Sequence, residues 1–459
     1  MTHQFNPTIL REYDIRGIVG DTLTEADAYA LGRGYAALAC EEGACRIAVG
    51  RDGRSHSVML EAALVRGLNE GGVDVMTVGE GPSPMLYFAT YYLDVDGGIQ
   101  VTGSHNPADY NGFKMLLKSR SVFGEEIQDL GRRCAEGNWS EGTGTIEEID
   151  VSAAYIDRLV EDFAGGDFRV GWDAGNGAAG PILDRLVDRL PGQHFTIFTD
   201  IDGSFPNHHP DPTVEANLED LKRLVADKNL DFGIAFDGDG DRIGAVDGKG
   251  RVIWGDQLMM ILAEQVLREI PGATIIADVK ASQILFDRIA ELGGKPLMWK
   301  TGHSLIKSKM KETGAPLAGE MSGHIFFKHR WYGFDDALYA AVRLIEAVSQ
   351  SGKSLTEIMD AMPQSVATPE MRFPVEESRK FAIVDEVLER LADEGAAVDP
   401  TDGARVNSSD GWWLLRASNT QDVLVGRAEA RDEAALERLL AQLDAQLAKS
   451  GVKRTEGAH

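Results

Sequence analysis

Cysteine is scarce in this chain of 459 residues, and its few copies are not paired. The three cysteines are Cys40, Cys45 and Cys134, and no C-x-x-C motif occurs. An odd number without such pairing excludes a disulfide framework and disfavours a thiolate zinc site, so we expect a reducing, cytoplasmic location.

No apolar run of about 18 residues occurs either, which excludes a membrane-spanning helix. The first residues, MTHQFNPTILREYDIRG, lack the apolar core of a secretory signal.

Basic residues are in deficit. Lys and Arg number 46 against 73 Asp and Glu, which gives a formal net charge of −27. A chain this acidic repels nucleic acids and anionic membrane surfaces, so neither is expected as a partner. A small anionic ligand stays possible if basic side chains converge locally. The hydrophobic fraction of 43% is that of an ordinary globular protein.

Short apolar runs alternate with amphipathic helical patterns along most of the chain. This alternation predicts βαβ units and parallel or mixed sheets, with breaks near residues 150 and 255. The proline-rich stretch 362–374 is interpreted as a linker, and a smaller pattern of helix, two strands and helix follows it. We therefore predict an α/β protein with three successive mixed-sheet domains of similar topology and a smaller C-terminal α+β domain. The predicted boundaries are 1–150, 151–254, 255–365 and 366–459.

The strongest local motif is DGDGDR. Asp237, Asp239 and Asp241 alternate with glycines directly after the apolar strand FGIAF, and Arg242 follows. Flexible glycines let three carboxylates reach one point, and oxygen ligands suit a hard divalent cation such as Mg2+. An EF-hand needs Gly at position six and Glu at position twelve, where this chain has Arg242 and Gly248. A solvated acidic turn is the remaining alternative.

A second motif, VTGSHNP, spans Val101 to Pro107 and places Ser104 after a predicted strand. It lacks the G-x-S-x-G pattern of a nucleophile elbow, which argues against a serine hydrolase. Taken alone, such a cluster of small polar residues is typical of a turn.

Five motifs together resemble the α-D-phosphohexomutases, in family order and over nearly the whole chain. They are GGIQVTGSHNPADYNGFK, DFGIAFDGDGDRIGAVD, KTGHSLIK, GEMSGH and RASNT. Within the family, GEMSGH together with RASNT resembles the bacterial phosphomannomutase/phosphoglucomutase group, whereas phosphoglucosamine mutases typically have GEQSGH and RPSGT. The resemblance implies four domains in a heart shape around a central cleft, with a mobile C-terminal domain.

The resemblance also implies a mechanism. Ser104 would carry a phosphoryl group and donate it to a hexose 1- or 6-phosphate, which forms a bound hexose 1,6-bisphosphate that returns its other phosphate. Three aspartates and a phosphoserine bring about −4.5 to −5 charges at pH 7, which Mg2+ and nearby cations would offset. Arg242, Lys114 and His105 are the candidate cations. Lys114 and His303 are candidates for acid and base, and which takes which role stays open.

Substrate contacts follow from the same resemblance. The loop GEMSGH would bind sugar hydroxyls and RASNT the non-transferring phosphate, with weaker candidates near the N-terminus and in DVKAS. The candidate residues are Glu320, Ser322, His324, Arg416, Ser418, Asn419, Thr420, Tyr13, Arg16 and Lys280. Gln421 and Asp422 stand where the family usually has a Thr/Glu-Pro pair. The absence of that proline would loosen the phosphate loop.

The implied partners are small sugar phosphates, and a monomer or weak dimer is expected. Two alternatives stay open. One is a mutase of different sugar preference, such as a phosphoglucosamine mutase. The other is a non-catalytic sugar-phosphate-binding protein that keeps the fold.

Overall fold

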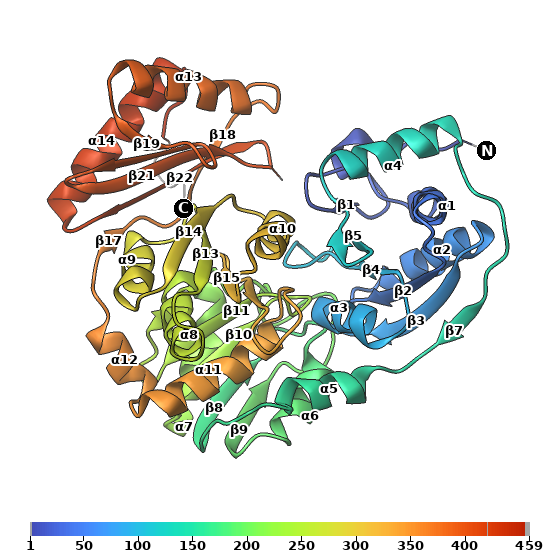
Figure 1. Ribbon diagram of the computed structural model, residues 1–459, viewed down its shortest axis with the longest axis horizontal. Helices are drawn as coiled ribbons and strands as arrows, with labels where there is room; N and C mark the ends of the chain where they lie inside the picture. Colours follow the sequence, from blue (N-terminus) through green and yellow to red (C-terminus); the bar gives the residue numbers. More distant parts are fainter. Residues whose placement is uncertain (1, 420, 455–459) are drawn as a thin grey trace.

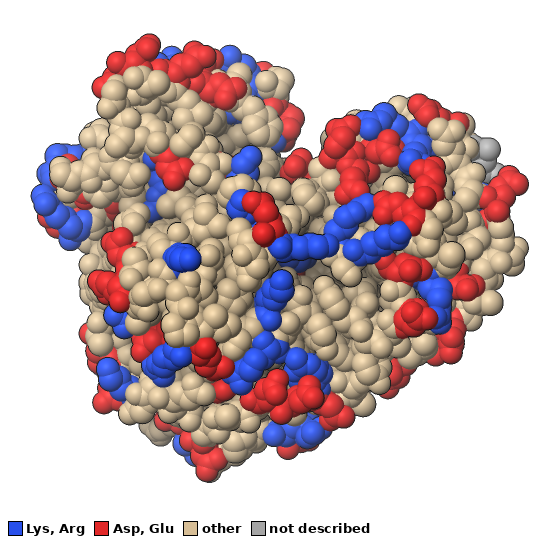
Figure 2. Space-filling view, viewed as in Figure 1, with Lys and Arg blue, Asp and Glu red and all other residues tan. Residues whose placement is uncertain are grey.

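The computed structural model describes residues 2–419 and 421–454. Three α/β domains and a smaller C-terminal domain follow one another along an arc (Figure 1), and their mixed sheets and helices confirm the predicted fold class. Figure 2 shows the molecule hollowed between its N-terminal and C-terminal lobes, with Lys and Arg side chains gathered along the hollow. No helix among the described residues is long and apolar enough to cross a membrane.

The first domain is built on a seven-stranded sheet with the order β1-β5-β4-β2-β3-β7, and β6 pairs with β5. Strands β4, β2, β3 and β7 run parallel, whereas β5 is antiparallel to both of its neighbours β1 and β4. The elements are β1 (Ile15–Ile18), α1 (Glu25–Glu41), β2 (Arg46–Arg51), α2 (Ser57–Glu70), β3 (Asp74–Glu80), α3 (Ser83–Tyr92), β4 (Gly97–Val101), β5 (Tyr110–Leu117), β6 (Arg120–Ser121), α4 (Glu125–Glu136) and β7 (Ile146–Glu148), preceded by a 3-10 turn at Pro7–Ile9.

The second domain has a five-stranded sheet with the order β12-β11-β10-β8-β9. Strands β10, β8 and β9 are parallel, and β11 is antiparallel to β10. The elements are α5 (Ser152–Val160), β8 (Phe168–Asp173), α6 (Gly180–Val187), β9 (Gly192–Ile197), a 3-10 turn (Glu215–Leu218), α7 (Glu219–Lys228), β10 (Phe232–Phe236), β11 (Ile243–Asp247) and β12 (Val252–Ile253).

The third domain has a four-stranded sheet with the order β14-β13-β15-β16, in which only β16 is antiparallel to its neighbour. The elements are α8 (Gly255–Glu269), β13 (Thr274–Asp278), α9 (Gln283–Glu291), β14 (Lys295–Trp299), α10 (His303–Thr313), β15 (Leu317–Gly319), β16 (Ile325–Phe327), α11 (Ala337–Ser351) and α12 (Leu355–Ala361).

The fourth domain is a six-stranded antiparallel sheet. The elements are β17 (Val366–Ala367), β18 (Met371–Pro374), α13 (Lys380–Asp393), β19 (Ala397–Asp399), β20 (Ala404–Ser408), β21 (Gly411–Ala417), β22 (Val423–Ala430) and α14 (Glu433–Lys449). The interpretation of 362–374 as a linker was wrong from residue 366 onward, because β17 and β18 both pair with β22. Proline is tolerated there because Pro374 ends an outer strand, where a missing backbone donor costs little.

The candidate loops occupy equivalent places in the first three domains. In each, a parallel strand turns back into an antiparallel neighbour: β4 into β5, β10 into β11, and β15 into β16. The connecting loops carry Ser104, the three aspartates and Glu320, respectively. The fourth candidate loop joins β21 to β22. The repeated topology therefore presents one loop per domain to the central hollow.

The hydrophobic core shows how the first three domains pack against one another. In β2, Ile47 and Val49 face a core of the first domain that includes α1, α2 and α4, whereas Ala48 faces the opposite side. This alternation is that of a strand buried on both faces. The core on the Ala48 side also contains residues of α3 and of the second and third domains. One core cluster is thus shared by the first three domains, although the first domain also has a core of its own, and the fourth domain has a separate core.

Candidate active site

One buried arginine, Arg54, binds the backbone of the Ser104 loop and holds it in place. Arg54 donates from its guanidinium nitrogens to the carbonyl oxygens of Ser104 at 2.7 Å and Asn106 at 2.6 Å, and also to those of Pro107 and Tyr110. The backbone N–H of Ser104 donates to Thr102 Oγ1 at 2.8 Å. Ser104 has a φ of 51°, a left-handed conformation that is uncommon for a residue with a side chain. These contacts fix the direction in which its hydroxyl points.

The acidic motif folds into a compact, fully buried turn. Asp237, Asp239 and Asp241 have no exposed surface, and one ligand oxygen from each lies within 4.8 Å of the others. Asp237 Oδ1 accepts from the backbone N–H groups of Asp241 and Arg242, each at 3.0 Å. Gly240 adopts a φ of 72°, which glycine accommodates without strain. The glycine spacing therefore brings the carboxylates together as the sequence predicts.

The Ser104 loop and the aspartate loop meet across a domain boundary. Ser104 Oγ donates to Asp237 Oδ2 at 3.4 Å, and its other neighbour is His105 Nδ1 at 3.2 Å. A Cβ added at Gly238 would lie 2.5 Å from the carbonyl oxygen of Ser104, so the two backbones approach closely. The hydroxyl and the carboxylates thus face each other in one site.

Lys114 neutralises part of this acidic cluster. Its Nζ donates to Asp239 Oδ2 at 2.6 Å and to Asp241 Oδ2 at 2.5 Å. Burial by itself would lower the pKa of Lys114, but the attraction of Asp239 and Asp241 outweighs it and raises the pKa well above its usual value. Ser83 donates from Oγ to the same oxygen of Asp239. Lys114, on β5 of the first domain, therefore carries a positive charge into the aspartate loop of the second.

The donor set of this cluster fits a hard divalent cation. Asp239 Oδ1 is buried and has no hydrogen-bond partner. Burial, followed by repulsion from Asp239 and Asp241, raises the pKa of Asp237 well above its usual value. A cation bound by these carboxylates would satisfy the unpartnered oxygen and remove the repulsion, and an oxygen-only set suits a hard metal ion. Asp237, Asp239 and Asp241 are therefore the residues that could hold a metal.

The loop between β15 and β16 places Glu320 and His324 against the aspartates. His324 Nδ1 lies 2.9 Å from Glu320 Oε2, and its Nε2 lies 3.2 Å from Asp241 Oδ1. Burial would lower the pKa of His324, but Asp241 and Glu320 raise it to about 9. Arg242 Nε lies 3.3 Å from His324 Nε2, and Ser322 Oγ lies 3.1 Å from His324 Nδ1. The second and third loops are thus joined through His324.

His303 opens α10 beside this loop. Its ring centroid lies 5.7 Å from that of His324 and 6.0 Å from that of Tyr13. Burial and the positive charges of Lys307 and Lys114 hold the pKa of His303 well below its usual value. The preceding residue, Gly302, donates its N–H to Glu320 Oε1 at 2.6 Å. A Cβ at Gly302 would overlap the Tyr13 ring, so glycine allows this approach.

The fourth-domain loop is in contact with the first and third domains. Asn419 Nδ2 donates to the Tyr13 hydroxyl, which itself donates to the Thr301 carbonyl at 2.7 Å. Arg416 Nε donates to Asp402 Oδ2 at 2.8 Å. Ser418 Oγ accepts from the N–H of Gln421 at 3.1 Å. Thr420 lies outside the described residues.

The two weaker basic candidates also have partners. Lys280 Nζ donates to Glu370 Oε2 at 3.1 Å, and this attraction lowers the pKa of Glu370 to about 2. Arg16 donates to Asn106 Oδ1 at 2.8 Å and pairs with Asp14. Arg16 thus lies beside the Ser104 loop, whereas Lys280 lies at the boundary between the third and fourth domains.

Sequence reasoning missed several residues that support the site. Arg54 lies in the segment GRDGRS, and nothing in this local sequence indicates that its side chain reaches residues 104–110. Asp335 and Lys307 flank His303, and Asp402 pairs with Arg416. Lys307 stands four residues after His303 in KTGHSLIK, a helical spacing that could have indicated the contact. Asp402 and Asp335 carry no such local signal.

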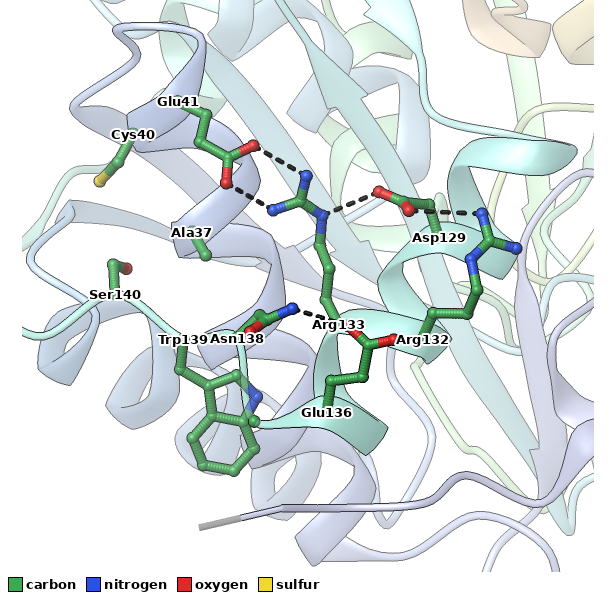
Figure 3. A pocket seen from close by; sticks show the side chains of 11 residues that line it. Ala37, Cys40, Glu41, Asp129, Arg132, Arg133, Glu136, Asn138, Trp139 and Ser140 are labelled. Carbon is green, nitrogen blue, oxygen red and sulfur yellow. Dashed lines mark hydrogen bonds and ion pairs between the residues drawn. The ribbon is translucent and has the colours of Figure 1, made fainter.

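A separate hollow on the first domain offers no comparable site. It lies beside α1 and α4 and is lined by residues that include Cys40, Glu41, Asp129 and Trp139 (Figure 3). Arg133 donates to both oxygens of Glu41, at 2.7 and 2.8 Å, and to Asp129 at 2.8 Å. Because its guanidinium is already bound by carboxylates, it has little left to offer an anionic ligand.

Comparison with known proteins agrees with the fold. The chain matches the family described as phosphoglucomutase/phosphomannomutase: alpha/beta/alpha domain I over 7–136, domain II over 153–250, domain III over 254–366 and the C-terminal domain over 370–446. These are α/β enzymes of four domains, in the phosphohexomutase fold. The chain belongs to the phosphoglucomutase/phosphomannomutase family.

Individual relatives are similar over nearly their full length. A phosphomannomutase/phosphoglucomutase of Pseudomonas aeruginosa is 46% identical over 434 residues, with 94% of each chain covered. A phosphoglucomutase of Neisseria gonorrhoeae is 45% identical, with 94% of this chain and 95% of the relative covered. A crystal structure of a family protein from Burkholderia thailandensis matches with a TM-score of 0.92 and 42% identity over 99% of both chains.

Proposed function

We propose that this protein is a phosphohexomutase that interconverts hexose 1-phosphates and hexose 6-phosphates of glucose, mannose or both. The observation that carries the proposal is the 3.4 Å contact between Ser104 Oγ and Asp237 Oδ2, because it puts a hydroxyl and a candidate metal cluster in one site. The relatives named phosphomannomutase/phosphoglucomutase support the choice of sugars.

In the proposed reaction, Ser104 carries a phosphoryl group in the resting enzyme. A hydroxyl oxygen of the sugar phosphate forms a bond to this phosphorus while the bond from phosphorus to Ser104 Oγ breaks. The attacking hydroxyl loses its proton to a base in the site, and Oγ regains one. The resulting hexose 1,6-bisphosphate reorients within the site, so that its other phosphate faces Ser104. Transfer of that phosphate back to Ser104 completes the isomerisation.

Asp237, Asp239 and Asp241 would hold Mg2+. When bound there, a divalent cation withdraws charge from the transferring phosphoryl group. Of the candidate cations, Arg242 stands beside the Ser104 and aspartate loops and acts on the same group, and Lys114 balances part of the charge of the carboxylates. His105, expected from the sequence to be a third cation, adjoins Ser104 as a neutral ring, because burial, followed by the charge of Arg242, holds its pKa well below its usual value. Phosphoryl transfer depends mainly on such positioning and charge stabilisation.

The remaining candidates would bind the substrate. Glu320, Ser322 and His324 offer hydrogen bonds to sugar hydroxyls. Arg416, Ser418, Asn419 and Thr420 would bind the non-transferring phosphate, with Tyr13, Arg16 and Lys280 nearby. Arg416 has guanidinium nitrogens beyond the Nε that binds Asp402, and these suit a phosphate. Three free thiols favour a cytoplasmic location, and a monomer or weak dimer is proposed.

Intact-mass measurement tests the proposal. The untreated protein should carry about 80 Da of extra mass from one phosphoryl group, and Ser104→Ala should lack it. Incubation with glucose 1-phosphate or mannose 1-phosphate and a trace of the bisphosphate should yield the 6-phosphate, which 31P NMR detects. A protein that never takes up phosphate on Ser104 would instead be a non-catalytic binder.

Steady-state comparison separates the sugar preferences. Glucose, mannose and glucosamine 1-phosphates would be compared by kcat/KM. Preference for the first two supports the proposal, and a decisive preference for the amino sugar would make the protein a phosphoglucosamine mutase.

A further inference from the structure

One side of the His303 ring is occupied by a buried ion pair. His303 and Lys307 stand one helical turn apart on α10, so their side chains lie on the same face. Lys307 Nζ lies 3.3 Å from His303 Nδ1 and donates to Asp335 Oδ1 at 2.9 Å. Asp335 is fully buried, at the end of the segment that follows β16. Lys307 is therefore held in place between the imidazole and the carboxylate.

The distances show whether Lys307 or Asp335 is the hydrogen-bond partner of His303 Nδ1. Asp335 Oδ2 is 3.7 Å from His303 Nδ1, which is too long for a hydrogen bond. Lys307 is closer, and an ammonium group can only donate. Nδ1 must then accept, so the proton of a neutral ring sits on Nε2. An Asp–His pair would give the opposite tautomer, with the proton on Nδ1.

The surroundings keep the ring neutral. Burial, together with the positive charges of Lys307 and Lys114, holds the pKa of His303 well below its usual value. The ring therefore has one proton at neutral pH, and its position is set by hydrogen bonding. The neighbouring rings on the other sides are His324 and Tyr13, both candidate substrate residues.

We propose that His303 acts as a neutral hydrogen-bond donor, through Nε2–H, to an oxygen of the sugar phosphate, and that Lys307 is the positioning residue that fixes this tautomer. The inference rests on the proposed mutase function and assigns a role that the motif leaves open. In this tautomer neither ring nitrogen is free to act as a base, because Nδ1 is bound by Lys307 and Nε2 carries the proton. Neutral imidazoles polarise substrate oxygens in this way in other enzymes.

The tautomer can be measured without any substrate. Protein labelled with 15N-histidine would be examined by long-range 1H–15N correlation, with His303→Gln used to assign the signals. We expect the Nε2–H pattern for His303 in the wild type and in Lys307→Arg. Lys307→Met should lose this preference, whereas Lys311→Met, an exposed change on the same helix, should not. An Nδ1–H pattern in the wild type, or an unchanged pattern in Lys307→Met, would overturn the proposal.

Kinetics test the role of the proton. A glutamine at position 303 can donate from its amide near the position of Nε2, whereas leucine cannot. We expect His303→Gln to keep kcat within about tenfold of the wild type and His303→Leu to lose at least about a hundredfold. Equal, large losses in both variants would assign His303 to proton transfer instead. If the wild type shows no mutase activity, the function fails while the NMR result still decides the tautomer.

Discussion

Lys114 and Asp239 form a buried ion pair that joins the first domain to the second, with Nζ 2.6 Å from Oδ2. Lys114 is 4% exposed and Asp239 fully buried, so neither charge is shared with bulk water. Without Lys114, the negative charges of the three buried aspartates would have no lysine to offset them. The pair therefore serves two purposes: it offsets part of the negative charge of the aspartate cluster, and it fixes how two domains meet.

Lys114→Met should destabilise the protein. The variant leaves Asp239 and Asp241 without their cation, and removal of one partner from a buried pair typically costs about 3–5 kcal/mol. Magnesium should restore part of the loss, because a cation bound by the aspartates replaces the missing charge. Thermal unfolding with and without millimolar MgCl2 measures both effects. The exposed change Lys328→Met is the control, and an equally small loss in the two variants would contradict the prediction.

Gly238→Ala should slow phosphoryl transfer with little effect on folding. The new Cβ would lie 2.5 Å from the Ser104 carbonyl and force the serine and aspartate loops apart. Because transfer depends on close positioning, we expect kcat to fall by at least about tenfold. Gly248→Ala is a matched control in the same domain, where the nearest atom is the Asp231 carbonyl oxygen at 3.0 Å. Similar kcat values in the two variants would show that loop spacing does not limit the reaction.

Arg405 should control the attachment of the fourth domain. Its Nη1 donates to the carbonyls of Val279 at 2.6 Å and Ala281 at 2.9 Å, on either side of Lys280, and its guanidinium stacks 3.8 Å from the Trp412 ring centroid. Arg405→Met leaves these third-domain carbonyls without a donor, which costs about 1–3 kcal/mol for each buried group.

We expect Arg405→Met to increase cleavage by a protease in the segment 362–380 and to raise KM more than it lowers kcat. Small-angle scattering should report a larger radius of gyration, because the fourth domain is held less firmly. Arg372→Met, an exposed change in the same sheet, serves as the control. Unchanged proteolysis and scattering in Arg405→Met would contradict the role.

Asp336 makes stability depend on pH. It caps α11 by accepting from the Tyr339 N–H at 2.9 Å and accepts from the Tyr155 hydroxyl at 2.9 Å, and burial raises its pKa to about 7. An unfolded Asp has a pKa of about 3.9, so between these values the folded protein holds a proton that the unfolded chain releases. The contribution of Asp336 to the free energy of unfolding is therefore greatest below about pH 4 and is lost as the pH rises toward 7.

Asp336→Asn removes this dependence while it keeps a capping oxygen. The Tm of the variant relative to the wild type should rise by roughly 5–10 °C between pH 5 and pH 8. The two pH units between pH 5 and the folded pKa of about 7 correspond to about 2.7 kcal/mol, and about 1 kcal/mol moves Tm by about 2–4 °C in a domain of roughly 150–250 residues. Asp432→Asn at the exposed cap of α14 is the control and should show no such trend. Parallel Tm curves for Asp336→Asn and the wild type would contradict the prediction.

Much of the site could be predicted because its parts are local. Ser104, the three aspartates and GEMSGH each lie in a short loop after a strand, and strand patterns together with glycine spacing mark such loops. The linker prediction failed because β17 and β18 are short edge strands whose partner, β22, lies about fifty residues further along the chain. Proline-rich local sequence could not reveal that pairing.

The amino-acid sequence by itself determined which strands form and which residues are brought to one loop, because strand alternation and glycine-spaced carboxylates act between near neighbours. Only the tertiary structure decided that Lys114 enters the aspartate loop, that Arg54 supports Ser104, and that Lys307 rather than Asp335 binds His303 Nδ1. These contacts depend on how separate domains pack through a shared core, and they are selected by burial and charge compensation between residues far apart in the chain.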